Sequence, residues 1–275
     1  MGVISDALGI VPAGRSLPLV FGSAFHKGME ALMTGKSIDE AVNEAKAYAI
    51  NEDLITISDT KRNITTLEIM LRDWEVQNRT SPNRASTVVI DDTPLVEASF
   101  CFKLADIDGY EVMWAGTIDA VVRRSDGLWV MDHKTTSRLG ETFADDKQRS
   151  DQMLGYVWAA QQISEVLREP IKGVLINAAS MQSKGPVFQT YPLPYAPSAV
   201  DAWLEDIKTN LHFLIKELEE FDFGNNHVRT NRESCVKKYG KCPYFDVCQY
   251  NEQMRAATLL SGAYQKTDYR KVKSS

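Results

Sequence analysis

The sequence predicts an α/β protein in which a central mixed β-sheet is flanked by helices. Three observations support this fold class. The first eighty residues show helical periodicity, the stretch from 85 to 136 is rich in β-branched and aromatic residues, and helix and strand patterns alternate after that. A chain of 275 residues, 44% of them hydrophobic, can bury a sizeable core. Helices, then strands, then an alternation of both are typical of an α/β domain.

The first part of the chain is expected to hold three helices. Residues 21–34 carry apolar side chains at helical spacing and end at Gly35. Ser37, followed three residues later by Glu40, is typical of a capping box that begins the second helix. The third helix is expected at 59–78, where a Ser-Pro-Asn-Arg-Ala-Ser tract then breaks the pattern.

Strands dominate the middle of the sequence, and helices return after them. The expected strands cover residues 88–90, 96–107, 110–124, 128–136, 171–179 and 187–193. The expected helices of this half cover residues 141–167 and 198–220. The last fifty residues hold three of the four cysteines.

Composition narrows the class of protein. No apolar run approaches the roughly 18 residues that a membrane span needs. The N-terminal residues lack a basic region followed by a continuous apolar stretch, so we expect no secretory signal and a cytoplasmic location. A net charge of −6 argues against a protein that is coated with phosphate-binding charge, but a local basic groove remains compatible with it.

Two strands in the middle of the chain carry charges where burial is expected. Asp126 and Gly127 are a strong hairpin signal, and if they form a two-residue turn, Asp119 lies opposite Lys134. Asp132 then lies on the same face, one diagonal step away, because strand side chains alternate. The hairpin therefore brings two carboxylates and one ammonium together.

This arrangement has two interpretations. One is a buried structural ion pair, although such pairs often stabilise a fold no better than apolar residues of the same shape. The other is a divalent metal site, since both carboxylates can reach one cation with oxygen ligands at about 2 Å. Three charges on one face favour the metal site.

Four motifs in this order resemble the PD-(D/E)XK nuclease superfamily, and specifically its RecB-like branch of phage and CRISPR-adaptation exonucleases. They are Phe21-Gly22-Ser23-Ala24-Phe25-His26, Gly116-Thr117-Ile118-Asp119, Asp132-His133-Lys134-Thr135 and Gln152-Met153-Leu154-Gly155-Tyr156. The likeness runs from about residue 20 to 250. It implies a restriction-endonuclease-like core in a single nuclease domain over 1–275. The expected parts are a helical region at 1–80, the nuclease core at 85–195, and a C-terminal helix with the cysteine segment at 196–275.

The resemblance assigns a role to each matching residue. It implies that His26, Asp119 and Asp132 ligate Mg²⁺ or Mn²⁺ and that the backbone carbonyl of His133 completes the protein ligands. The side chain of His133 is expected to be structural. Lys134 is expected to orient the attacking water and to offset charge on the phosphate.

The fourth motif lies on a predicted helix. Gln152 and Tyr156 are four residues apart and therefore share one helix face. The resemblance implies that this face meets the active site and contacts DNA or Lys134. The alternative is simple helix packing.

The cysteine-rich segment has its own resemblance. Cys235, Cys242 and Cys248 are separated by six and five residues, which is not the spacing of a zinc ribbon. With its Cys-Pro-aromatic tract, the group resembles the C-terminal cysteines of RecB-like nucleases that carry a 4Fe–4S cluster. A fourth cysteine before the histidine helix, which the family supplies, is not present in residues 1–16.

The metal that these cysteines bind is therefore open. One alternative is an iron–sulfur cluster whose fourth ligand is not identified, because such clusters usually take four thiolates. A second is a zinc site that His227 completes, and a third is no metal at all. Cys101 lies in a predicted strand, and we interpret it as a small buried residue.

The leading functional hypothesis is a metal-dependent DNA exonuclease that acts in phage DNA processing, recombination or repair. Its expected partners are DNA and proteins of recombination or repair, in the cytoplasm of a bacterial or phage-infected cell, without a membrane. One alternative is a non-catalytic nucleic-acid-binding module with a nuclease-like fold, which intact Asp119, Asp132 and Lys134 argue against. Another is a metal-stabilised interaction domain, which does not explain the charges of the hairpin.

Overall fold

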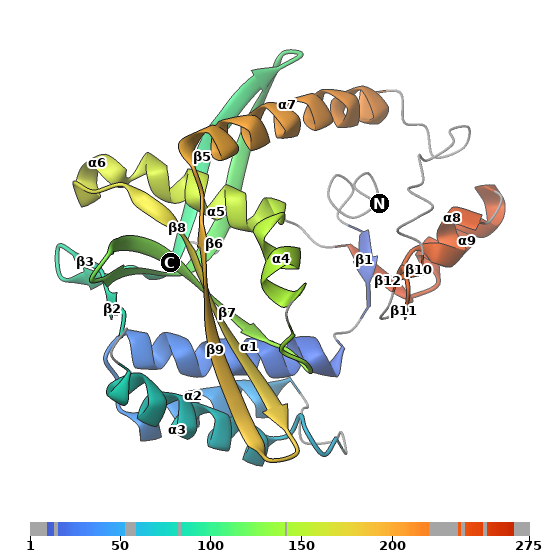
Figure 1. Ribbon diagram of the computed structural model, residues 1–275. Helices are drawn as coiled ribbons and strands as arrows, with labels where there is room; N and C mark the ends of the chain where they lie inside the picture. Colours follow the sequence, from blue (N-terminus) through green and yellow to red (C-terminus); the bar gives the residue numbers. More distant parts are fainter. Residues whose placement is uncertain are drawn as a thin grey trace. The chain divides into compact units, whose positions relative to one another are not determined.

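The computed structural model describes residues 10–13, 16–52, 59–81, 84–140, 142–219, 236–237, 240–249 and 252–266 (Figure 1). The chain divides into two compact units. The sheet unit comprises Arg15–Ala105 and Glu111–Glu205, and the terminal unit comprises Met1–Gly14, Asp106–Tyr110 and Asp206–Ser275. Among the described helices, none has the length and apolar character that a membrane span needs. The sheet unit contains every charged residue of the predicted nuclease motifs.

The sheet unit begins with three helices: α1 (Leu17–Met33), α2 (Ile38–Asn51) and α3 (Ile64–Thr80). The predicted capping box is present, since the side chains of Ser37 and Glu40 each bond the backbone N–H of the other residue. The third helix begins later than predicted. Asp59 accepts hydrogen bonds from the backbone of two following residues, and Asn63 caps the helix by accepting from the N–H of Thr66 at 2.9 Å.

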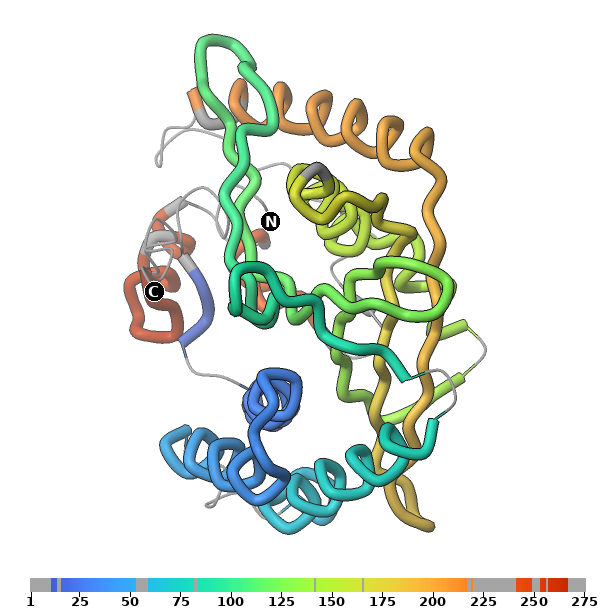
Figure 2. The backbone as a smooth tube through the Cα atoms, turned by 90° about the vertical axis from the view of Figure 1, so that its left-hand side faces the viewer, coloured from blue at the N-terminus to red at the C-terminus, as the bar shows by residue number. Residues whose placement is uncertain are grey.

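A six-stranded mixed sheet forms the centre of this unit. Its strands are β2 (Ser86–Thr87), β5 (Val96–Ile107), β6 (Tyr110–Arg124), β7 (Gly127–Thr135), β8 (Ile171–Gln182) and β9 (Gly185–Pro194). The order is β2-β6-β7-β8-β9, with β5 also paired to β6. Only the β7–β8 pair along this order is parallel. The two long strands β8 and β9 run side by side in Figure 2. The predicted fold class is therefore confirmed.

Three helices connect the parallel strands β7 and β8: α4 (Thr142–Gln148), α5 (Asp151–Gln162) and α6 (Ser164–Leu167). The predicted helical conformation of residues 141–167 is confirmed within the described residues, but the chain forms three separate helices there. The chain leaves the helical conformation at Ser150, which has extended backbone angles and begins α5. The long helix α7 (Pro197–Glu219) follows β9 and agrees with its prediction within the described residues. A small hairpin, β3 (Val89–Ile90) and β4 (Thr93–Pro94), precedes β5.

The core lies between the sheet and the helices on either side of it. Helices α1 and α3 contact β7, β8 and β9, and α5 contacts β7 and β8. Met33 of α1 packs on a buried cluster that includes Met131 and Leu175. Strand β7 is buried along most of its length, as expected for a strand with neighbours on both faces. Figure 1 shows α1–α3 together at the bottom of the view and α4–α6 higher in it, on the other side of β7.

One core prediction was wrong. Cys101 is exposed rather than buried, because its neighbours along β5, Phe100 and Phe102, occupy the inward-facing positions of the alternation. The rings of these two phenylalanines stack at 6.0 Å between centroids. Phe102 also meets the edge of Trp158 from α5 at 6.4 Å.

The terminal unit consists of short elements around a small apolar cluster. They are β1 (Ile10–Pro12), β10 (Val236–Lys237), β11 (Gly240–Lys241), α8 (Phe245–Gln249), α9 (Glu252–Leu260) and β12 (Tyr264–Lys266). Strand β1 pairs antiparallel with β12, which joins the two ends of the chain. Tyr244 and Val247 form the buried centre of the cluster.

A close contact between α5 and β6 yields a prediction about stability. A Cβ atom added at Gly155 would lie 2.5 Å from the indole of Trp114, which is closer than any normal carbon contact. The rigid ring cannot move away cheaply, so Gly155→Ala is expected to lower the free energy of unfolding by about 1–3 kcal/mol despite the better helix propensity of alanine. Urea denaturation of the full chain measures this change.

Gly140→Ala is the matched control, because a Cβ at Gly140 would meet nothing within 4 Å. It is expected to leave the urea midpoint within about 0.5 kcal/mol of the parent protein. Equal stability of the two variants would show that α5 does not depend on this contact.

Candidate metal centre

The hairpin between β6 and β7 positions the two aspartates, but its register differs from the predicted one. Ser125 and Asp126 form the turn, and Arg124 pairs with Gly127. Gly127, which was predicted as the second turn residue, instead follows the turn. Its φ of +128° is one that glycine adopts readily. The pairing continues to Ala120 and Met131, and the next step along it places Asp119 opposite Asp132 instead of Lys134.

The shift of the register leaves the faces unchanged. It moves the pairing by two residues, and side chains repeat with a period of two along a strand. Asp119, Asp132 and Lys134 therefore still belong to one face, as the sequence predicted. The ammonium of Lys134 donates to Asp132 Oδ1 at 2.7 Å.

Asp132 is the most deeply buried member of this cluster. Its side chain is only 1% exposed, and Lys134 satisfies one of its two oxygens. The other oxygen, Oδ2, is buried and accepts no hydrogen bond from the described residues. A buried carboxylate oxygen without a partner is costly. A cation next to Oδ2 would remove that cost.

Asp119 is held from the backbone of the neighbouring strand. Its Oδ2 accepts a hydrogen bond from the His133 N–H at 2.7 Å and lies 3.4 Å from His26 Nδ1. Burial, together with the negative charge of Asp132, raises the pKa of Asp119 to about 7, although the His133 N–H and Lys134 act in the opposite direction. The carboxyl group thus holds a proton near neutral pH when nothing else offsets its charge.

Helix α1 brings His26 to the same point. The helix begins after Ser16, with a proline in its first turn, and packs along β7. A Cβ at Gly22 would lie 3.1 Å from Thr135 Oγ1, so glycine allows the close approach of α1 to the end of β7. Burial and the charge of Lys134 lower the pKa of His26, which keeps its imidazole neutral and able to act as a ligand near pH 7.

A third carboxylate, Glu97 of β5, belongs to the cluster and was missed from the sequence. One ligand atom from each of His26, Glu97 and Asp119 lies within 4.8 Å of the other two. Glu97 has a φ of +48°, a conformation that non-glycine residues adopt rarely and that is found preferentially at functional sites. Burial and the charge of Asp119 raise the pKa of Glu97.

The pairing of β5 explains why Glu97 was missed. The N–H of Val121 donates to Leu95 O at 2.9 Å, and counting two residues forward from Leu95 and two residues back from Val121 leads to Glu97 and Asp119. Counting instead from the turn at Asp108 and Gly109 would place Ala98, not Glu97, opposite Asp119. Only the irregular pairing along β5 brings the glutamate into line, and sequence counting does not find it.

Gln152 and Tyr156 of the fourth motif lie on α5 and bond to each other, with Gln152 Nε2 donating to Tyr156 Oη at 2.9 Å. Burial raises the pKa of Tyr156, and the charges of Asp132 and Asp119 raise it further. The phenol is therefore protonated, and the charges of both aspartates act on it. Tyr156 is therefore within electrostatic range of both aspartates, and contact of the pair with DNA or Lys134 stays a prediction.

The side chain of His133 projects from the other face of β7. Its Nδ1 accepts a hydrogen bond from Asn177 Nδ2 at 2.8 Å, and its Nε2 lies 3.2 Å from Met33 Sδ. Burial lowers the pKa of His133 well below its usual value, so the ring is neutral and its proton is on Nε2. The imidazole anchors the strand while its backbone N–H holds Asp119. Ligation of a metal by its carbonyl stays a prediction.

The cysteine prediction falls partly outside the described residues, because Cys235 lies there. Cys242 and Cys248 are described, and both pack against the cluster formed by Tyr244 and Val247. The N–H of Tyr244 points at Cys242 Sγ from 3.4 Å. His227, the alternative zinc ligand, also lies outside the described residues.

The chemistry of the cluster fits a divalent cation. Glu97, Asp119 and Asp132 bring three carboxylates to the cluster, and the ammonium of Lys134 binds one of them. Carboxylates and a neutral histidine are ligands that Mg²⁺ and Mn²⁺ accept. The unbonded Oδ2 of Asp132 and the raised pKa of Asp119 both mark a place where positive charge is missing.

Comparison with known proteins agrees with this geometry. A family model described as the PD-(D/E)XK nuclease superfamily matches residues 4–249. The chain belongs to this superfamily. The candidate metal centre of this PD-(D/E)XK protein thus belongs to a chain of a nuclease superfamily. The match does not resolve the branch within that superfamily.

Two further comparisons add little. No curated protein matches the chain. A solved structure titled "Crystal structure of SSO0001" is 12% identical and covers 61% of this chain and 68% of that chain. Its TM-score of 0.30 is too low to support an argument.

The pKa of Asp119 predicts how metal binding depends on pH. A cation must displace the proton that Asp119 holds below about pH 7. Apparent affinity for Mn²⁺ is therefore expected to rise about tenfold per pH unit below pH 7 and to level off above it. Calorimetric titration in buffers of different ionisation enthalpy would measure both the affinity and the protons released.

The variant Asp119→Asn serves as the control, since its amide cannot hold the proton. It should bind Mn²⁺ more weakly and lose the dependence on pH around 7. Affinity that is flat between about pH 6 and 8 in the parent protein would contradict the assignment of Asp119 as a ligand.

Proposed function

We propose that this PD-(D/E)XK protein is a Mg²⁺- or Mn²⁺-dependent DNA exonuclease of the RecB-like branch. The observation that carries the proposal is the group of Glu97, Asp119 and Asp132 beside Lys134, in which the buried Asp132 Oδ2 lacks a hydrogen-bond partner among the described residues. His26 stands at the same group, as the motif order of the branch implies.

The proposal gives each residue of the site a role. A divalent cation bound by the carboxylates and His26 would lower the pKa of a bound water and offset phosphate charge. The ammonium of Lys134, held by Asp132, is placed to orient the attacking water and to stabilise the anionic transition state. Gln152 and Tyr156, which bond to each other on α5, would contact the DNA strand or keep Lys134 in position.

Cleavage assays test the catalytic proposal. Lys134→Ala and Asp119→Asn are each expected to lower the rate of Mn²⁺-dependent DNA cleavage by about 100-fold or more while the protein stays folded. Linear DNA should be degraded from its ends, and covalently closed circular DNA should persist. The readout is the release of nucleotides from end-labelled and circular substrates, with circular dichroism to check folding.

Lys172→Ala is the matched control. Lys172 is an exposed lysine at the start of β8, where this strand pairs with the start of β7, away from Lys134. It should cleave at the parental rate. Binding of DNA without cleavage in the parent protein would favour a non-catalytic binding module. Cutting of circular DNA would favour an endonuclease.

We also propose that Cys235, Cys242 and Cys248 hold a metal, with an iron–sulfur cluster as the first choice and zinc as the second. The support is their resemblance to the family group and the packing of Cys242 and Cys248 on one small cluster. A triple Cys→Ser variant is expected to lose the metal and to melt at lower temperature, because losing a ligand of the native state lowers stability.

Metal analysis of protein purified without oxygen, with a visible absorption spectrum, measures the outcome. Cys101→Ser is the control, since Cys101 is exposed on β5. A triple variant with unchanged melting temperature and metal content would reject the cysteine site.

A further inference from the structure

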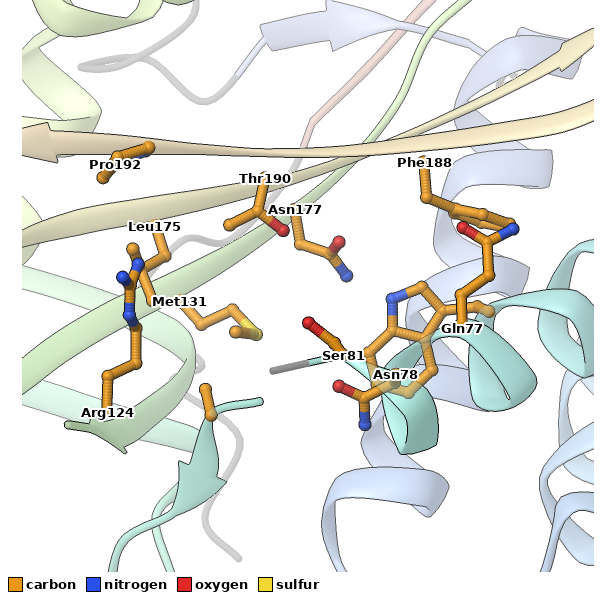
Figure 3. A pocket seen from close by; sticks show the side chains of 12 residues that line it. Gln77, Asn78, Ser81, Arg124, Met131, Leu175, Asn177, Phe188, Thr190 and Pro192 are labelled. Carbon is orange, nitrogen blue, oxygen red and sulfur yellow. The ribbon is translucent and has the colours of Figure 1, made fainter. Parts of the chain in front are cut away.

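A hollow of about 340 Å³ opens on the sheet unit away from the metal centre (Figure 3). Helix α3 and the chain after it form one wall, and strands β6, β7, β8 and β9 form the other. The residues that carry its chemistry are Trp74, Asn78, Arg124, Asn177, Phe188 and Thr190. Its volume lies near the lower limit of the range of small-molecule sites, which suits one small organic ligand.

The hollow lies on the side of β7 opposite to the catalytic charges. Met131 lines it, and alternation along the strand sends Asp132 and Lys134 the other way. His133, which shares the face of Met131, contacts the hollow's wall. It accepts a hydrogen bond from Asn177 and meets the edge of Trp74 at 6.3 Å between ring centroids. An occupant would therefore not compete for the metal ligands.

The lining combines flat apolar surface with neutral hydrogen-bonding groups. Trp74 and Phe188 supply aromatic rings, and Asn78, Asn177 and Thr190 supply amides and a hydroxyl. None of the described residues that line the hollow is acidic. Rings with amides beside them suit a planar heterocycle, which can stack and form hydrogen bonds at its edge. The lack of carboxylates disfavours a cation.

Positive charge stands at one end of this lining. In Figure 3, Arg124 lies at the end opposite Gln77 and Asn78, with Asn177 and Thr190 between them. Arg124 Nε is buried without a hydrogen-bond partner among the described residues, and it forms an ion pair with Asp126 Oδ1 at 3.4 Å. That oxygen already accepts from the indole N–H of Trp129 at 3.0 Å. The guanidinium therefore keeps capacity for an anion.

An adjoining hollow of about 390 Å³ extends the site. The two share a wall that includes Trp74, Asn78 and Met131. Of its cations, Lys36 and Arg79 are paired with Glu44 and Glu75 at 2.6 and 2.5 Å. Arg84 is exposed, and the described residues offer it no ion-pair partner. A second arginine, in the lining of the adjoining hollow, is thus available to an anionic group.

We propose that the hollow is a nucleoside monophosphate site, separate from the metal centre. The base stacks against Trp74 and Phe188, and amide groups bond its edge. The phosphate binds Arg124 and Arg84 by charge-assisted hydrogen bonds, which are stronger than neutral ones. The volume admits one nucleotide rather than an oligonucleotide. This inference goes beyond the proposed nuclease activity and does not require it.

Binding of deoxyadenosine 5′-monophosphate to the full-length chain tests the proposal. Calorimetry in the presence of a chelator is expected to show saturable binding of one nucleotide per chain, because no metal is needed at this site. Deoxyadenosine and inorganic phosphate alone should each bind at least about tenfold more weakly, since each lacks one half of the recognised groups.

Variants locate the site. Arg124→Gln and Asn78→Ala are expected to weaken binding about tenfold and several-fold, in line with the loss of one charged and one neutral hydrogen bond. Arg123→Gln is the matched control, because Arg123 is the next residue on β6, faces the other way and binds Glu169 with both carboxylate oxygens at 2.7 Å. It should bind nucleotide like the parent chain.

Lys134→Ala separates this proposal from the proposed nuclease activity. It should abolish cleavage and leave nucleotide binding unchanged. Loss of nucleotide binding in Lys134→Ala, normal binding in Arg124→Gln with unchanged melting temperature, or equal affinity for inorganic phosphate would each overturn the proposal. Absence of saturable binding would overturn it as well.

Discussion

The repulsion between closely spaced carboxylates, one of them fully buried, is the constraint on which the centre of this protein depends. Asp119 and Asp132 face each other across paired strands, and Glu97 joins them from a third strand. Lys134 and the backbone N–H of His133 offset part of the charge. A proton on Asp119 or a bound cation offsets the remaining negative charge. This part of the fold therefore favours the binding of positive charge.

Rigid packing keeps the carboxylates together in spite of this repulsion. They lie on strands of one sheet, which fix the side chains better than loops can. Gly22 lets α1 approach the end of β7, and Gly155 lets α5 approach Trp114, so helices on two sides press against the strands that carry the charges. The site therefore depends on positions that have no side chain at all.

Strand β7 links two environments through the alternation of its residues. Asp132 and Lys134 project toward the carboxylate cluster, whereas Met131 and His133 project toward the helices α1 and α3 and the hollow beside them. His133 belongs to both, because its ring bonds Asn177 while its N–H holds Asp119. A change in the packing of the His133 ring would therefore shift the N–H that holds the carboxylate of Asp119.

The sequence by itself determined the features that local chemistry controls. The capping box at Ser37 follows from side-chain hydrogen bonds within four residues, and the shared face of Asp132 and Lys134 follows from the two-residue period of a strand. The motif order predicted the superfamily, which the family match confirmed. These inferences need no knowledge of which distant segments meet.

Only the tertiary structure decided the features that depend on long-range pairing. The register of the β6–β7 hairpin differs from the predicted one by two residues, because Gly127 takes its positive φ after the turn. Glu97 entered the cluster through irregular pairing of β5, which no count from a turn predicts. The hollow arose where α3 meets four strands. In each case the deciding free energy comes from contacts between residues far apart in the chain, which local propensity and spacing do not encode.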